Sequence, residues 1–233
     1  MAGPADTRDP RSLSTRFRKR RDVLLREFIR QQRANRHTNV GPMQILDIGG
    51  TADYWRRVGF EFIESNNLHI TCTNITATEF GPLPELKARF DFHVGDARNL
   101  PFADNAFDLV HSNSVVEHVG RFGDMVAYAH EVRRLAPAYY IQTPYYWFPI
   151  DPHFYRVPFF HWLPEAVRLR LVRRFKIGWA GPVTDVAHGM RIVESAVLLD
   201  CLRFSAIFPD ADHRFERLFG LPKSLLALRG YTS

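Results

Sequence analysis

Five short apolar runs alternate with stretches of helical pattern, and this alternation constrains the fold more than any other feature. The runs with a strand pattern are residues 44–48, 68–74, 90–94, 107–112 and 139–143. The stretches with a helical pattern are residues 52–63, 84–89 and 122–135. Strands that alternate with helices form a parallel sheet covered on both faces. The sequence therefore predicts a doubly wound α/β domain.

The C-terminal part departs from this alternation. Residues 190–202 have the pattern of a further helix, and residues 213–219 and 224–230 follow as two closely spaced strands. A parallel pair would need a crossover of about a dozen residues, so we expect these two strands to pair antiparallel.

Residues 1–40 hold the basic excess of the chain. They carry 11 Lys/Arg against 4 Asp/Glu, whereas the remaining 193 residues carry 20 against 21. That neutral body argues against a nucleic-acid substrate. Residues 1–12 are polar and contain proline, and we expect them to be disordered.

An arginine-rich helix is expected from about Ser14 to Gln32. Its apolar stripe consists of Val23, Leu24, Leu25, Phe28 and Ile29. We expect this helix to pack on the domain, with peripheral contact to an anionic surface as the alternative.

Residues 139–162 contain 11 aromatic residues and four prolines, a density that excludes a long helix or a central strand. We therefore divide the chain into a basic segment, 1–40, and a domain, 41–233, with an aromatic insertion over 144–186. Ligands of open α/β sheets bind at the carboxyl ends of the strands, so an insertion after the fifth strand is placed to cover such a site.

Glycine and short polar side chains follow the predicted strands at these carboxyl ends. Gly49 and Gly50 follow the first strand, where glycine lets the backbone approach a ligand closely. Asn74 ends the second strand with a side chain that can hold ribose hydroxyls. Asp96 follows the third strand and can accept a hydrogen bond from an adenine amino group. We expect these groups to surround one crevice.

Three stretches carry a resemblance to a known family: ILDIGG at 45–50, VGDARNLPFADNAFDLVHSNSVVEHV at 94–119 and LPKSLLAL at 221–228. They are similar to the class I S-adenosylmethionine methyltransferases, particularly the small bacterial ones. The resemblance implies a seven-stranded, mainly parallel sheet of order 3-2-1-4-5-7-6 whose last strand is antiparallel. It also implies S-adenosyl-L-methionine as cofactor and S-adenosyl-L-homocysteine as product.

Two departures from the family pattern leave alternatives open. The family's first turn is commonly Gly-x-Gly-x-Gly, but Thr51 and Asp53 replace its later glycines, and the usually acidic ribose position is Asn74. A non-catalytic binding protein that kept the fold is one alternative. An NAD(P)-dependent oxidoreductase is another, but its Gly-x-Gly-x-x-Gly turn would need glycines where Thr51 and Tyr54 stand.

The expected cofactor contacts are residues at the strand ends: Asp47, Gly49, Gly50, Thr51, Asn74, Ile75, Asp96, Ala97, Ser112 and Asn113. The alternative for Asp47 is a turn-fixing role, and Asp96 could instead cap a helix. Ser112 and Asn113 could likewise cap the helix that follows them.

Methyl transfer needs a base only when the acceptor must lose a proton, and His118, His153 and His161 are the candidates. Asp151, His153 and His161 follow no recognised metal-ligand spacing, so no metal site is predicted. The aromatic insertion suggests a small or partly apolar acceptor, with residues 144–162 as one wall of its pocket.

Two cysteines, Cys72 and Cys201, make no disulfide framework, and we expect both to be small buried hydrophobes. No run approaches the ~18 consecutive apolar residues of a membrane span. These observations favour a cytoplasmic protein.

Overall fold

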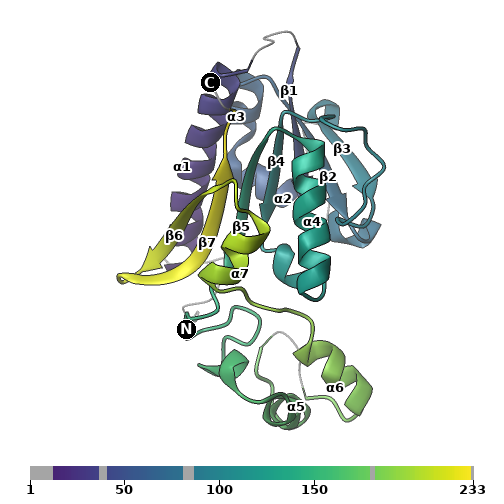
Figure 1. Ribbon diagram of the computed structural model, residues 1–233, viewed down its shortest axis with the longest axis vertical. Coiled ribbons are helices and arrows are strands. Elements are labelled where there is room, and N and C mark those ends of the chain that lie inside the picture. Colours follow the sequence, from purple (N-terminus) through teal and green to yellow (C-terminus); the bar gives the residue numbers. More distant parts are fainter. Residues whose placement is uncertain (1–12, 37–40, 81–86, 179–181, 232–233) are drawn as a thin grey trace.

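Seven strands form one sheet in the computed structural model, which describes residues 13–36, 41–80, 87–178 and 182–231 (Figure 1). The strands are β1 (Met43–Ile48), β2 (Leu68–Asn74), β3 (Phe90–Val94), β4 (Leu109–Asn113), β5 (Ala138–Pro144), β6 (Asp212–Leu218) and β7 (Leu221–Arg229). Their order is β3-β2-β1-β4-β5-β7-β6. β1 to β5 pair in parallel, and β7 lies antiparallel between β5 and β6. The predicted sheet and its strand order are confirmed.

Helices cover both faces of this sheet (Figure 1). α1 (Leu13–Ala34), α2 (Ala52–Val58) and α3 (Phe60–Ser65) pack on one face, whereas α4 (Phe122–Leu135) and α7 (Cys201–Ile207) pack on the other. Successive strand residues point to opposite faces, so Ile45 joins the first of these cores and Leu46 the second. Both side chains are fully buried.

Two helix predictions are wrong in extent. The helix expected over 52–63 is interrupted at Gly59, whose φ of 113° ends α2 and begins α3. The single helix expected over 190–202 is two helices, α6 (Val186–Val193) and α7. Between them Leu199 is buried and forms a β-bridge with Tyr145, and Asp200 then caps α7 by accepting from the Arg203 amide. Of the stretch 84–89, the described part is a 3₁₀ turn, Lys87–Arg89.

The N-terminal helix α1 packs on the sheet as expected. Leu25 and Ile29 are fully buried in the core that contains Trp55. Val23 and Leu24 were wrongly assigned to the buried stripe, because they lie on the opposite side of the helix and are 63% and 46% exposed. The disorder expected for residues 1–12 lies outside the described residues.

The aromatic insertion lies beyond the edge at which β1 to β5 end, and it includes the 3₁₀ turn η4 (Phe160–Trp162) and α5 (Glu165–Arg174) (Figure 1). Together with α6, which begins at its last residue, it has a small separate core formed by Phe154, Phe160, Val172, Ile177 and Val193. Other rings of the insertion, including Trp147 and Phe159, are exposed.

Cys72 is buried and Cys201 is half-buried, and both are free thiols. Within the described part of the chain, no helix combines the length and apolarity needed to cross a membrane.

Candidate functional site

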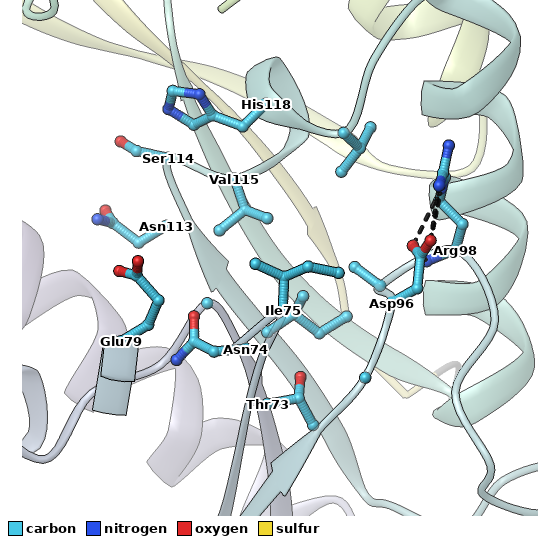
Figure 2. Close-up of a pocket in the computed structure, with 15 residues that line it drawn as sticks. Thr73, Asn74, Ile75, Glu79, Asp96, Arg98, Asn113, Ser114, Val115 and His118 are labelled. Carbon is cyan, nitrogen blue, oxygen red and sulfur yellow. Dashed lines mark hydrogen bonds and ion pairs between the residues drawn. The ribbon is translucent and has the colours of Figure 1, made fainter. Parts of the chain in front are cut away.

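A cavity of about 690 Å³ opens where β1 to β4 end (Figure 2). Its walls are formed by Ile48, Gly49, Thr73, Asn74, Ile75, Glu79, Gly95, Asp96, Ala97, Arg98, Asn113, Ser114, Val115, His118 and Val119. We call this cavity the crevice; its volume falls within the ~300–1,000 Å³ of small-molecule sites. The predicted cofactor residues that line it are Gly49, Asn74, Ile75, Asp96, Ala97 and Asn113. Of the predicted catalytic residues, His118 lines it.

The other predicted cofactor residues support the crevice from behind its walls. The residues concerned are Asp47, Gly50, Thr51 and Ser112. Thr51 caps α2, its hydroxyl accepting from the Tyr54 amide at 3.2 Å. Ser112 is buried and donates to the Ile48 carbonyl at 3.0 Å. These four residues do not line the crevice, and their contact with a cofactor stays a prediction.

Both glycines of the first turn are required by close packing. Gly49 has a φ of +74°, and a Cβ there would collide with the side chain of Val115. A Cβ on Gly50 would collide with the carboxylate of Asp47. The turn thus has its tight shape without the family's later glycines, because Thr51 begins α2 directly with a side-chain cap.

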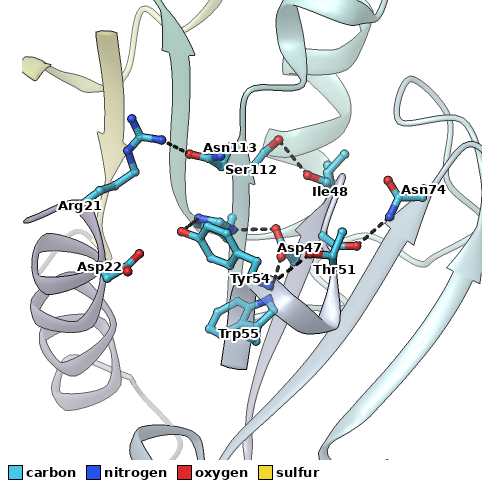
Figure 3. A network of polar contacts seen from close by, with 12 residues as sticks. Arg21, Asp22, Asp47, Ile48, Thr51, Tyr54, Trp55, Asn74, Ser112 and Asn113 are labelled. Atoms are coloured by element: carbon cyan, nitrogen blue, oxygen red, sulfur yellow. Dashed lines mark hydrogen bonds and ion pairs between the residues drawn. The ribbon is translucent and has the colours of Figure 1, made fainter. Parts of the chain in front are cut away.

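A buried polar network fixes β1 against β4 behind this turn (Figure 3). Asp47 accepts from the Trp55 indole at 2.7 Å and from His111 Nδ1 at 2.6 Å. His111 Nε2 is then the acceptor for the Tyr54 hydroxyl at 3.0 Å. Burial and the charge of Asp47 raise the pKa of Tyr54 well above its usual value, so this hydroxyl remains a donor. His111 was not predicted as a site residue, because it lies inside an apolar strand with no local signal of its partners.

Arg21 connects α1 to the same edge of the sheet (Figure 3). Its guanidinium donates to Glu216 on β6, to Gln142 at 3.1 Å and to Asn113 in the crevice wall. Its side chain is 12% exposed. Arg21 belongs to the arginine-rich helix predicted from the sequence, but nothing local in the sequence indicates these distant acceptors.

Asn74 and Glu79 lie along the same side of the crevice (Figure 2). The Asn74 amide donates to the Gly50 carbonyl at 2.7 Å, which leaves its oxygen for a ligand. Glu79 is exposed and lies in the 3₁₀ turn η1 (Ala77–Phe80) that follows β2. It supplies a carboxylate five residues after the position where the family usually has one, and the sequence analysis missed it.

Asp96 follows β3 and forms an ion pair with Arg98 at 2.6 Å (Figure 2). Hydrogen bonds from the Arg98 side chain and amide lower the pKa of Asp96, so its carboxylate is ionised at neutral pH. Arg98 also reaches Asp124 on α4 at 2.6 Å. Asp96 is thus held in the crevice wall with lone pairs still available to a ligand.

His118 and His153 meet at the end of the crevice, Nε2 to Nε2, at 3.0 Å. His153 also contacts Asp151, which is 2% exposed, at 2.7 Å. Burial alone would lower the pKa of His153, but the hydrogen bond and charge of Asp151 and the charge of Glu117 raise it. Glu117 lies beside them and is buried, which raises its pKa. The structure thus brings two of the three predicted histidines together.

His161 lies elsewhere, in a second cavity of about 530 Å³ between the insertion and residues 120–121. Its Nε2 donates to the Tyr146 carbonyl at 2.7 Å. None of the residues from 144–162 lines the crevice, and within the described part of the insertion His153 connects to it through its contact with His118.

Comparison with known proteins agrees with this geometry. A family model described as a methyltransferase domain matches residues 48–137. Over this part, the chain is similar to the class I S-adenosylmethionine-dependent methyltransferases. A similar curated protein is the ubiquinone/menaquinone biosynthesis C-methyltransferase of Dinoroseobacter shibae, 33% identical over 99 residues. That match covers 39% of this chain and only 38% of the relative.

Solved structures resemble this chain in fold. Magnesium protoporphyrin IX methyltransferase from Synechocystis, with S-adenosylmethionine bound, has a TM-score of 0.53 at 11% identity and covers 93% of this chain and 82% of its own. The PH0226 protein from Pyrococcus horikoshii has a TM-score of 0.53 at 16% identity, with coverage of 99% and 97%. Identities this low establish the shared fold alone.

Proposed function

We propose that the crevice binds S-adenosylmethionine and that the domain transfers its methyl group to a small molecule at the His118 end. The observation that carries this proposal is the convergence of Gly49, Glu79 and Asp96 on one cavity at the carboxyl ends of the strands. The family match and the bound ligand of the Synechocystis structure support it.

The polar and apolar groups that line the crevice fit the ribose, adenine and methionine parts of the cofactor. Glu79 and the Asn74 oxygen are placed to accept from ribose hydroxyls, and Asp96 is placed to accept from the adenine amino group. Ile75 is 64% exposed beside them and offers an apolar surface to the adenine ring. Gly49 brings bare backbone to the wall where the methionine part would lie.

When bound, S-adenosylmethionine supplies an electrophilic methyl group on a good leaving group. The chain's own contribution is then chiefly alignment, which can supply about 7–11 kcal/mol of a reaction barrier. Arg98 and Arg21 serve this role by fixing Asp96 and Asn113 in the crevice wall. His118, which lines the crevice, would face the methyl acceptor, and His153 contacts His118 from the side of the insertion.

Titration calorimetry tests the proposal with S-adenosylmethionine and S-adenosylhomocysteine. Glu79→Gln should weaken binding about tenfold, since an amide offers the two ribose hydroxyls one uncharged acceptor oxygen in place of a carboxylate. Glu61→Gln is the matched control, because Glu61 is exposed on α3 and does not line the crevice. If neither ligand binds, the proposal fails.

Turnover is tested by incubating the labelled methyl donor with a panel of small hydroxyl, amine and thiol acceptors and measuring mass shifts. Binding without transfer to any acceptor would favour the non-catalytic alternative.

Cytoplasmic location and contact of α1 with an anionic surface remain predictions.

A further inference from the structure

Three metal-ligating groups from two distant segments converge beside the crevice. Glu117 and His118 follow β4 in the 3₁₀ turn η3 (Val116–His118), and His153 comes from the insertion. One ligand atom from each of the three lies within 4.8 Å of the others. The closest approach is the 3.0 Å between the two Nε2 atoms.

The hydrogen bonds of the two imidazoles decide where their protons are. His118 Nδ1 lies 2.6 Å from the Ser195 carbonyl oxygen, which can only accept, so Nδ1 carries the proton. His153 Nδ1 likewise donates to the Asp151 carboxylate. In the neutral rings both Nε2 atoms then present lone pairs to each other, which is repulsive unless a cation or an extra proton lies between them.

The buried carboxylate of Glu117 is a second, independent sign that this cluster lacks a binding partner. Its side chain is 1% exposed, and one oxygen accepts from the Thr143 hydroxyl at 2.9 Å. The other oxygen, Oε1, is buried without a hydrogen-bond partner. A buried carboxylate oxygen without a partner is costly, and one oxygen of this carboxylate lies within 4.8 Å of a ligand nitrogen of each histidine.

We propose that Glu117, His118 and His153 bind a divalent transition-metal ion of the zinc type. Two imidazoles and one carboxylate are a common ligand set for such ions. Tetrahedral zinc with Zn–N of about 2.05 Å holds its two nitrogens about 3.3 Å apart, close to the 3.0 Å found here. Asp151 and the Ser195 carbonyl orient the two rings through Nδ1, as outer partners of metal-bound histidines do.

Three protein ligands leave a fourth position open, as in catalytic rather than structural zinc sites. His118 is exposed and also lines the crevice, so the open position lies near its acceptor end. This second step rests on the proposed function: the ion would hold an oxygen or sulfur atom of the methyl acceptor. Metal binding itself does not depend on it.

The test uses full-length protein without a histidine tag, stripped with a chelator and titrated with Zn²⁺. Wild type should bind one equivalent, measured by calorimetry and elemental analysis, and Co²⁺ should give the visible absorption of a tetrahedral site. His153→Ala and Glu117→Gln should weaken zinc binding at least tenfold, and Asp151→Asn about 10–100-fold. His161→Ala is the matched control, since it removes another insertion histidine that lies outside the cluster.

Urea unfolding of each variant separates loss of the site from loss of the fold. Glu117→Gln retains the acceptor for Thr143, and His153 is half-buried, so at least the latter variant should fold. Absence of stoichiometric zinc binding in wild type would overturn the proposal, as would undiminished affinity in His153→Ala. Failure of the proposed methyl-transfer function would instead appear as absent S-adenosylhomocysteine binding with zinc binding intact.

Discussion

The crevice and the aromatic insertion meet at His118 but are built in different ways. The crevice is formed by the ends of hydrogen-bonded strands, and its floor is fixed by the buried network around Asp47 and His111. The insertion has a small separate core around Phe160 and joins the domain at points such as the bridge of Tyr145 to Leu199 and the contact of His153 with His118. From this difference we expect the strand-built crevice to be the rigid half of the molecule and the insertion to open more readily than the sheet.

Removal of the Trp55 side chain, which lies in the half that forms the crevice, should give the largest loss of stability. Trp55 is fully buried and donates to Asp47, so Trp55→Ala leaves a cavity and one carboxylate oxygen without its donor. We expect the free energy of unfolding to fall by about 3–5 kcal/mol in urea denaturation. Trp147→Ala is the control: Trp147 is 57% exposed, and its loss should cost less than about 0.5 kcal/mol. Equal losses would remove the contrast between the two regions.

Phe160→Ala probes the insertion in the same way. Phe160 is fully buried against Phe154, with ring centroids 4.2 Å apart, so its truncation should cost about 3 kcal/mol. We expect hydrogen exchange to show this loss in the amides of α5 and α6, while β1 to β4 keep their protection. If strand amides lose protection equally, the insertion and the sheet are one cooperative unit and the comparison above is wrong.

Arg21→Ala tests whether α1 belongs to the rigid half. The change breaks a nearly buried ion pair with Glu216 and removes the donors to Gln142 and Asn113. We expect about 2 kcal/mol of lost stability, because the remaining acceptors keep only part of their solvation. Arg20→Ala is the matched control from the exposed side of the same helix. Identical melting curves for both variants would show that α1 contributes through its apolar residues alone.

The sequence predicted the elements governed by local pattern. Strand periodicity and the glycine turn located β1 to β5 within a few residues, and the resemblance supplied the strand order. The prediction of a single helix over 190–202 was wrong, because the burial of Leu199 and the helix cap at Asp200 outweigh helical propensity there. Such tertiary contacts are not encoded in a short window of sequence.

The candidate site likewise divides into residues that local sequence pattern predicts and residues that only tertiary contacts bring into place. Residues that end strands, such as Asn74 and Asp96, were located correctly at the crevice, because a sheet brings its strand ends together. Glu79 was missed because an irregular turn, not a strand, positions it. The pairing of His118 with His153 joins positions 35 residues apart through an insertion whose path has no periodic signal.

Asp96→Asn should give the smallest effect on stability and a clear effect on binding. The side chains of Asp96 and Arg98 are each 40% exposed, and ion pairs this exposed contribute little to stability. The crevice wall should therefore stay folded, with an unfolding midpoint close to that of wild type. Binding of S-adenosylhomocysteine should nevertheless weaken about three- to thirtyfold, since an amide accepts less strongly from the adenine amino group than an ionised carboxylate does.

Asp104→Asn is the matched control for this prediction. Asp104 is also an exposed carboxylate paired with an arginine, Arg134 at 2.8 Å, but it lies outside the crevice. Both variants lose one surface ion pair, so a difference in calorimetric affinity between them isolates ligand contact from general loss of charge. If the two variants bind S-adenosylhomocysteine equally well, Asp96 serves only to anchor Arg98, and the adenine must be recognised by the backbone and apolar residues of the wall. The rigid half would then act through its shape rather than through this carboxylate.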